Sequence, residues 1–227
     1  MVTILMKTRG VLCTAVAGSL ALAVTGCAGG DDGSEVEQEP TVSAERLCGG
    51  TAVSPAAAEA LEVIMGVDQF EASAKEYTIP LAVEALRLKG KTEGTGTEDI
   101  CRIYTPIDAL TEPLRVRWWL SDSTATKDDD VASKFTALPM GNLAGTSTDE
   151  AFVAFDCHDN NSPLTSVPYH IDIFVETTDL PVEPEGDPQA LEDAFATLAH
   201  TFAVAISKEL RCTDNGGLKA QPSLTPA

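Results

Sequence analysis

Residues 114–120, with the sequence LRVRWWL, alternate between two kinds of side chain. Leucine, valine and tryptophan occupy every second position, while two arginines and a second tryptophan occupy the positions between them. A period of two is typical of a β-strand that has one buried face and one face in contact with water. The segment therefore predicts a strand in a sheet that is covered on one side.

A long amphipathic helix is expected over Pro188–Arg211. Its apolar residues recur at spacings of three and four: Leu191, Phe195, Leu198, Phe202, Ile206 and Leu210. Such a helix must place its apolar stripe against another apolar surface. The opposite, polar side would carry Asp193, Thr197, His200 and Ser207.

The remaining segments complete the expected fold. A first helix is expected over 54–65, because Ser54 and Pro55 form a typical helix start. A second is expected over 80–89, with Leu81, Ala85 and Leu88 on one face and Gly90 at its end. Further strands are expected at 100–104, 135–138, 151–157 and 169–176. This order predicts an α+β fold, in which N-terminal helices and the long C-terminal helix pack on one face of an antiparallel sheet.

Residues 1–26 have the layout of a secretory signal peptide. Lys7 and Arg9 precede an apolar run of about 14 residues, shorter than the ~20 that span a bilayer. The run leads into Leu22-Ala23-Val24-Thr25-Gly26-Cys27, which resembles the lipobox of bacterial lipoproteins. The resemblance implies that the thiol of Cys27 receives a diacylglyceryl group and that cleavage makes Cys27 the first residue. The alternative is an ordinary signal peptide with a cysteine at its boundary.

This resemblance implies a membrane anchor and a location on the extracytoplasmic face of the cell membrane. Two acyl chains give stable anchoring without a transmembrane helix. Residues 27–47 would form the acylated start and a flexible acidic tether, since 28–46 carries six acids and no aromatic residue. A single domain is then expected over 48–212, and 213–227 is expected to be a disordered tail.

The body of the chain also resembles lipoproteins of high-GC Gram-positive bacteria. Three pieces carry this resemblance: Cys48–Met65, the CRIY sequence at Cys101–Tyr104, and Leu210–Leu218. It implies no activity, because those lipoproteins have none assigned.

The four cysteines of the domain are Cys48, Cys101, Cys157 and Cys212. An even number outside the cytoplasm indicates disulfides, and four cysteines allow three pairings. We expect Cys48 with Cys101 and Cys157 with Cys212, so that each bridge links a helix end to a strand. Structural zinc sites usually have cysteines two to four residues apart. These cysteines lie more than forty apart, so no metal site is expected.

The charge balance of 15 Lys and Arg against 35 Asp and Glu gives a net charge of −20. Nucleic-acid binding depends on dense basic residues, so no nucleic-acid partner is expected. No catalytic motif surrounds His158, His170 or His200, and neither a catalytic residue nor a cofactor is predicted. The alternative functions are a hydrolase-like enzyme with a histidine base and an accessory subunit of a cell-envelope complex.

The most promising recognition surface is the outward face of 114–120. Arg115, Arg117 and Trp119 would lie there, beside His170 and Asp172 if their strands are neighbours. Arginine and tryptophan are enriched at binding hot spots. The alternative is that the arginines pair with nearby acids and Trp119 lies under a loop. We therefore expect a binding module for an unidentified protein or small molecule.

Overall fold

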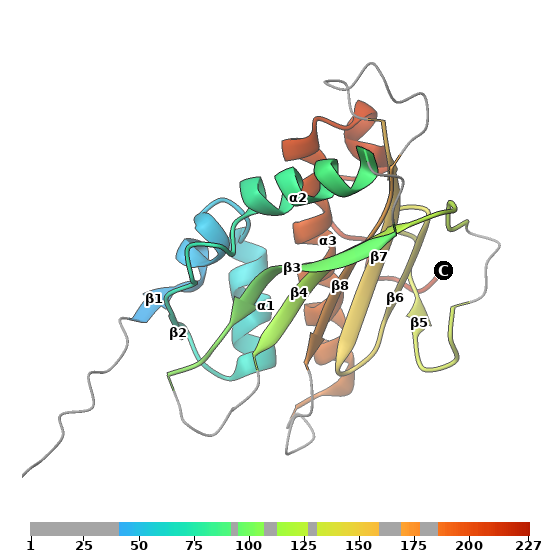
Figure 1. The fold of residues 1–227 in the computed structure, drawn as a ribbon. Helices are drawn as coiled ribbons and strands as arrows, with labels where there is room; N and C mark the ends of the chain where they lie inside the picture. Colours follow the sequence, from blue (N-terminus) through green and yellow to red (C-terminus); the bar gives the residue numbers. More distant parts are fainter. Residues whose placement is uncertain (1–40, 92–94, 107–112, 127–130, 159–168, 178–185) are drawn as a thin grey trace, which may run out of the picture. The chain divides into compact units, whose positions relative to one another are not determined.

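Six antiparallel strands form the central sheet (Figure 1). The structure is a computed structural model that describes residues 41–91, 95–106, 113–126, 131–158, 169–177 and 186–227. The strand order is β3–β4–β8–β7–β6–β5. Their bounds are β3 Gly96–Ile103, β4 Leu114–Ser121, β5 Thr136–Ala137, β6 Leu143–Thr146, β7 Glu150–Cys157 and β8 Tyr169–Thr177.

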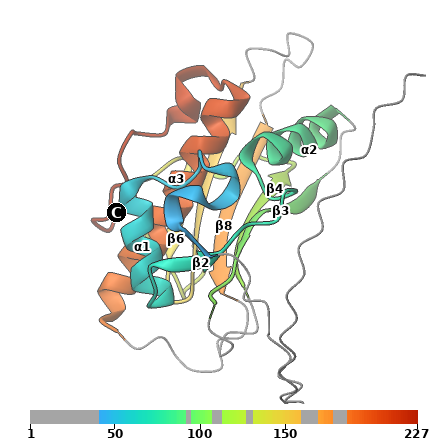
Figure 2. The ribbon, with the colours of Figure 1, turned by 90° about the vertical axis from the view of Figure 1, so that its left-hand side faces the viewer.

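The helices cover one face of this sheet (Figures 1 and 2). The long helix α3 (Pro188–Leu210) packs on β6, β7 and β8, and α2 (Ile79–Lys91) packs on β3 and β4. Helix α1 (Pro55–Met65) packs on α3. The α+β prediction, with an antiparallel sheet and a long C-terminal helix, is confirmed.

Local sequence signals account for the ends of two helices. The hydroxyl of Ser54 accepts a hydrogen bond from the backbone N–H of Ala57, and Gly66 ends α1 in the left-handed conformation. The carboxylate of Asp187 caps α3 by accepting from the N–H of Gln189. These contacts satisfy backbone groups that have no partner inside the helix.

The folded unit begins earlier than we expected. Residues 41–47 were assigned to the tether, but Thr41–Ser43 forms β1, which pairs with β2 (Gln69–Glu71). A 3₁₀ segment, η1 (Ala44–Gly49), follows and buries Leu47 completely. Cys48 in η1 is bonded to Cys101 in β3, as expected. The expected signal peptide, Cys27 and residues 28–40 lie outside the described residues.

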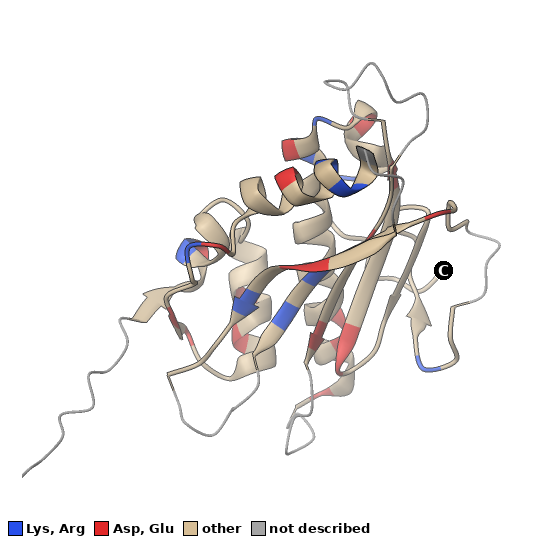
Figure 3. Ribbon diagram, viewed as in Figure 1, with Lys and Arg blue, Asp and Glu red and all other residues tan. Residues whose placement is uncertain are grey.

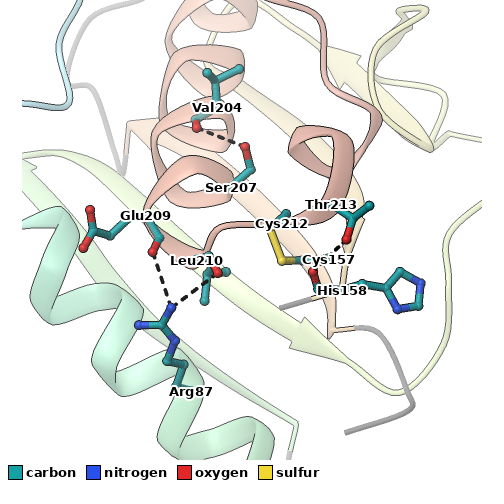
Figure 4. The surroundings of a disulfide bond; sticks show 9 residues. All are labelled: Arg87, Cys157, His158, Val204, Ser207, Glu209, Leu210, Cys212 and Thr213. Atoms are coloured by element: carbon teal, nitrogen blue, oxygen red, sulfur yellow. Dashed lines mark hydrogen bonds between the residues drawn. A yellow bond between two sulfur atoms is a disulfide. The ribbon is translucent and has the colours of Figure 1, made fainter. Parts of the chain in front are cut away.

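The C-terminal segment also differs from the prediction of a disordered tail. It forms a short 3₁₀ element, η2 (Thr213–Gly217), buries Leu218, and places the N–H of Ala227 3.1 Å from the carbonyl of Ala137. The expected Cys157–Cys212 bond ties the start of this segment to the end of β7 (Figure 4). Long-range contacts of this kind hold a segment whose composition alone favours disorder.

Helix α2 is oriented differently from the prediction. Leu81 and Leu88, which were placed on one apolar face, are both exposed. The buried side instead contains Ile79, Ala82, Val83 and Leu86. The helix has two apolar sides, and its contacts with β3, β4 and α3 decide which of them is covered.

Within the described ranges, none of the helices combines the length and the apolar character that a membrane crossing requires.

Candidate functional site

The face of the sheet opposite α3 carries the residues that the sequence placed outward. On β4, Leu114, Val116, Trp118 and Leu120 are buried, whereas Arg115 and Arg117 are partly exposed and Trp119 is 47% exposed. On β8, Ile171, Ile173 and Val175 are buried. The predicted alternation of both strands is therefore confirmed. We call the outward side, formed by β3, β4, β8 and β7, the open face.

Both arginines of the predicted surface are engaged in ion pairs. Arg115 lies 2.8 Å from Asp99, and Arg117 lies 2.7 Å from Glu176. Asp99 also pairs with Arg102 at 2.6 Å. Figure 3 shows basic and acidic positions close together on this part of the sheet. The structure thus matches the alternative interpretation for the arginines, because nearby acids compensate their charge.

One donor of Arg117 remains unused. Its Nε is buried and has no hydrogen-bond acceptor among the described residues. Arg117 and Arg115 line a cavity of about 430 Å³, whose other lining residues are Glu76, Tyr77, Thr97, Glu98 and Asp99. A buried N–H without an acceptor is costly.

Trp119 is the first member of a row of aromatic side chains. Its ring lies 6.4 Å from that of Phe174 on β8, which lies 5.8 Å from Phe152 on β7. Phe135, just before β5, continues the row at 5.1 Å from Phe152. Such separations are typical of favourable aromatic pairs. We call Trp119, Phe174, Phe152 and Phe135 the aromatic row.

The sequence analysis missed three members of this row. Phe174 and Phe152 occupy outward positions in the strands that were predicted, so the alternation alone could have revealed them. Only the register places them together, since Phe152 is directly opposite Phe174. Phe174, Phe152 and Phe135, but not Trp119, line a cavity of about 420 Å³. Its other lining residues are Ala125, Val131, Ala132, Lys134, Leu143, Glu150, Ala154 and Asp172.

A polar cluster lies at the end of the open face near Ser121. The Nδ1 atom of His170 is 2.7 Å from a carboxylate oxygen of Asp156 and 3.0 Å from the hydroxyl of Thr124. Beside it, Ser121 donates a hydrogen bond of 3.1 Å to Asp172. Burial raises the pKa of Asp172, while the hydrogen bond from Ser121 opposes that change.

The cluster does not have the geometry of a catalytic relay. In a serine-type triad the carboxylate holds one ring nitrogen of histidine and the other nitrogen contacts the hydroxyl. Here Asp156 and Thr124 both contact Nδ1 of His170. The arrangement therefore gives no support to the hydrolase alternative at this histidine.

The two other histidines lie elsewhere. His158 follows β7, is exposed, and points away from the Cys157–Cys212 bond (Figure 4). His200 was expected on the polar side of α3, but it is only 2% exposed, and Thr197 and Ser207 are buried too. The prediction was wrong because α1 and the segment around Lys219 cover this side of α3.

In the part of the chain that the structure describes, no three His, Cys, Asp or Glu side chains are grouped so as to hold a metal ion. Comparison with protein-family models, curated proteins and solved structures found no match. The function must therefore be argued from the residues themselves.

Proposed function

We propose that the protein is a lipid-anchored binding module on the extracytoplasmic face of the cell membrane, and that its ligand contacts the aromatic row of the open face. The ligand is a protein or a small molecule, and binding involves no catalysis. The observation that carries the binding part of the proposal is the exposure of Trp119 at the head of four aromatic residues, of which the other three line a cavity.

The energetics of the open face support this surface over the arginines. Arg115 and Arg117 already have acidic partners, so a ligand that engaged their charge would have to displace those partners. Trp119 instead leaves nearly half of a large apolar side chain in water. Covering that surface is favourable by about 25 cal/mol per Å², and tryptophan is prominent among binding hot spots.

The anchoring part of the proposal rests on the sequence around Cys27. The Cys27→Ala variant should appear in the culture supernatant or remain an uncleaved precursor. Cys13→Ala is the matched control, because Cys13 lies inside the apolar run without the small residues that precede Cys27. Normal processing and unchanged membrane retention of Cys27→Ala would contradict the lipid anchor.

The binding part is tested separately by capturing ligands with the purified full-length protein, whether it comes from the membrane or from the culture supernatant. Ligands that bind the aromatic row should be lost from Trp119→Ala but retained by Val63→Ala, since Val63 on α1 is also 47% exposed. Identical captured sets for the wild-type protein and both variants would contradict the assignment of this surface. The anchoring result does not affect this outcome.

A further inference from the structure

A second cavity, of about 480 Å³, lies on the side of the helices away from the sheet. It is formed by the start of α1, by one side of α3 and by Ala220–Pro222. Its lining residues are Thr51, Ala52, Val53, Ser54, Pro55, Ala56, Thr197, His200, Thr201, Val204, Ala205, Lys208, Ala220, Gln221 and Pro222. This volume is within the range of small-molecule sites.

The residues that line this cavity differ in charge from the chain as a whole. None of its residues is acidic, although the chain has 35 Asp and Glu against 15 Lys and Arg. Lys208 contributes a positive charge. In the first turn of α1, Pro55 has no N–H, and the N–H groups of Ala57 and Ala58 donate to the hydroxyl and the carbonyl of Ser54. The N–H of Ala56 has no acceptor within the helix and lies at the positive end of the helix dipole.

His200 is the buried polar side chain of the cavity wall. It is 2% exposed, and burial lowers its pKa, so the imidazole is neutral near pH 7. A hydrogen bond with the backbone of Lys219 involves one side of the ring. A neutral imidazole has one donor and one acceptor nitrogen. The hydrogen bond with Lys219 therefore occupies one of these two nitrogens.

The other walls are apolar. Val53 is buried, and Val204, Ala205 and Pro222 provide further aliphatic surface. An apolar wall combined with a cation, the N–H of Ala56 and no carboxylate fits a ligand that has one anionic group on an apolar body.

We propose that this cavity binds a small organic carboxylate, held by Lys208 and the backbone N–H of Ala56, with its apolar part against Val53 and Val204. The site is separate from the open face and does not depend on the function proposed for it.

The test uses the purified full chain and a matched set of probes: benzoate and hexanoate as carboxylates, and benzamide and hexanamide as their neutral analogues. Isothermal titration should show saturable binding of at least one carboxylate with a stoichiometry of one. The corresponding amide should bind at least about tenfold more weakly, because it lacks the charge-assisted interaction.

Two variants locate the binding. Lys208→Met should weaken carboxylate binding about tenfold, while Lys75→Met, at an exposed lysine that does not line the cavity, should leave it unchanged. Ala205→Leu should narrow the cavity beside Val204 and weaken binding, with the folded state checked by circular dichroism. Trp119→Ala on the open face should have no effect.

Three results would overturn the proposal: no saturable binding of either carboxylate at millimolar concentration, equal affinity for carboxylate and amide, or carboxylate binding that is unchanged in both Lys208→Met and Ala205→Leu. None of these results bears on the aromatic row, whose test uses different variants.

Discussion

The guanidinium group of Arg87, on α2, lies 3.3 Å from the backbone carbonyl of Leu210 and 3.4 Å from that of Glu209, at the end of α3 (Figure 4). A cation at this position satisfies carbonyl groups that have no partner within the helix and interacts favourably with the helix dipole.

Replacing Arg87 with Met should therefore destabilise the protein by about 1 kcal/mol, while the aliphatic stem is largely kept. The free energy of unfolding, measured by urea denaturation, reports this loss. Glu84→Gln on the exposed side of α2 is the control and should change stability little. Equal stability of Arg87→Met and the wild-type protein would show that the contact contributes nothing.

The Cys157–Cys212 bond should contribute strongly to stability, because it closes a loop with a sequence separation of 55. In the chain-entropy model the double variant Cys157→Ser/Cys212→Ser loses up to about 4 kcal/mol. The Cys48–Cys101 pair has a similar separation of 53, so its removal should cost a similar amount. Urea midpoints measure both losses, and peptide mapping without reduction checks the pairing. A mapped bridge between Cys101 and Cys157 would contradict the structure.

Gly90 should not tolerate a side chain. A Cβ atom at Gly90 would lie 2.1 Å from the ring of Tyr169. Alanine is the better helix former by about 1 kcal/mol, but the clash should outweigh this gain and make Gly90→Ala about 1–2 kcal/mol less stable. In thermal unfolding, the addition of Tyr169→Leu should recover part of the loss. An increase in stability for Gly90→Ala alone would contradict the close packing.

His200 should make stability fall in mild acid. Burial lowers its pKa in the folded state, so the unfolded chain binds the proton more readily. The stabilisation that His200 contributes is fully present above about pH 6.5, the ordinary pKa of histidine in an unfolded chain. It is lost as the pH falls toward the lowered pKa of the folded state. Unfolding free energies between pH 5 and 8 should show this slope, which His200→Gln should reduce. The exposed His158→Gln should retain it, and an unchanged slope in His200→Gln would contradict the assignment.

Asp172 should have the opposite effect from His200, because it should lower the stability of the protein as the pH rises. Its raised pKa means that the folded state holds the proton more tightly, so its contribution is present at low pH and is lost as the pH rises through that pKa. Asp172→Asn removes the buried charge and retains an acceptor for Ser121. The variant should be more stable than the wild-type protein at pH 7, with the difference shrinking toward pH 4. Exposed Asp122→Asn is the control, and a less stable Asp172→Asn protein at pH 7 would contradict the prediction.

Much of the fold could be predicted because its signals are local. The alternation of residues 114–120 placed Trp118 inside and Trp119 outside, and Ser54 and Gly66 marked the ends of α1. The short strands β1, β2 and β6 were missed. Segments of three or four residues carry too little periodic pattern to separate them from loops.

The sequence by itself determined the layer order: strands with one buried face, and a long helix that had to cover it. Only the tertiary structure decided which acids neutralise Arg115 and Arg117, which side of α2 is covered, and that His200 is enclosed. It also brought Trp119, Phe174, Phe152 and Phe135 into one row. The physical reason is the distance in sequence over which each feature is decided. Periodicity and helix caps depend on neighbours along the chain, whereas burial and ion pairing depend on strand register and on segments that are distant in sequence.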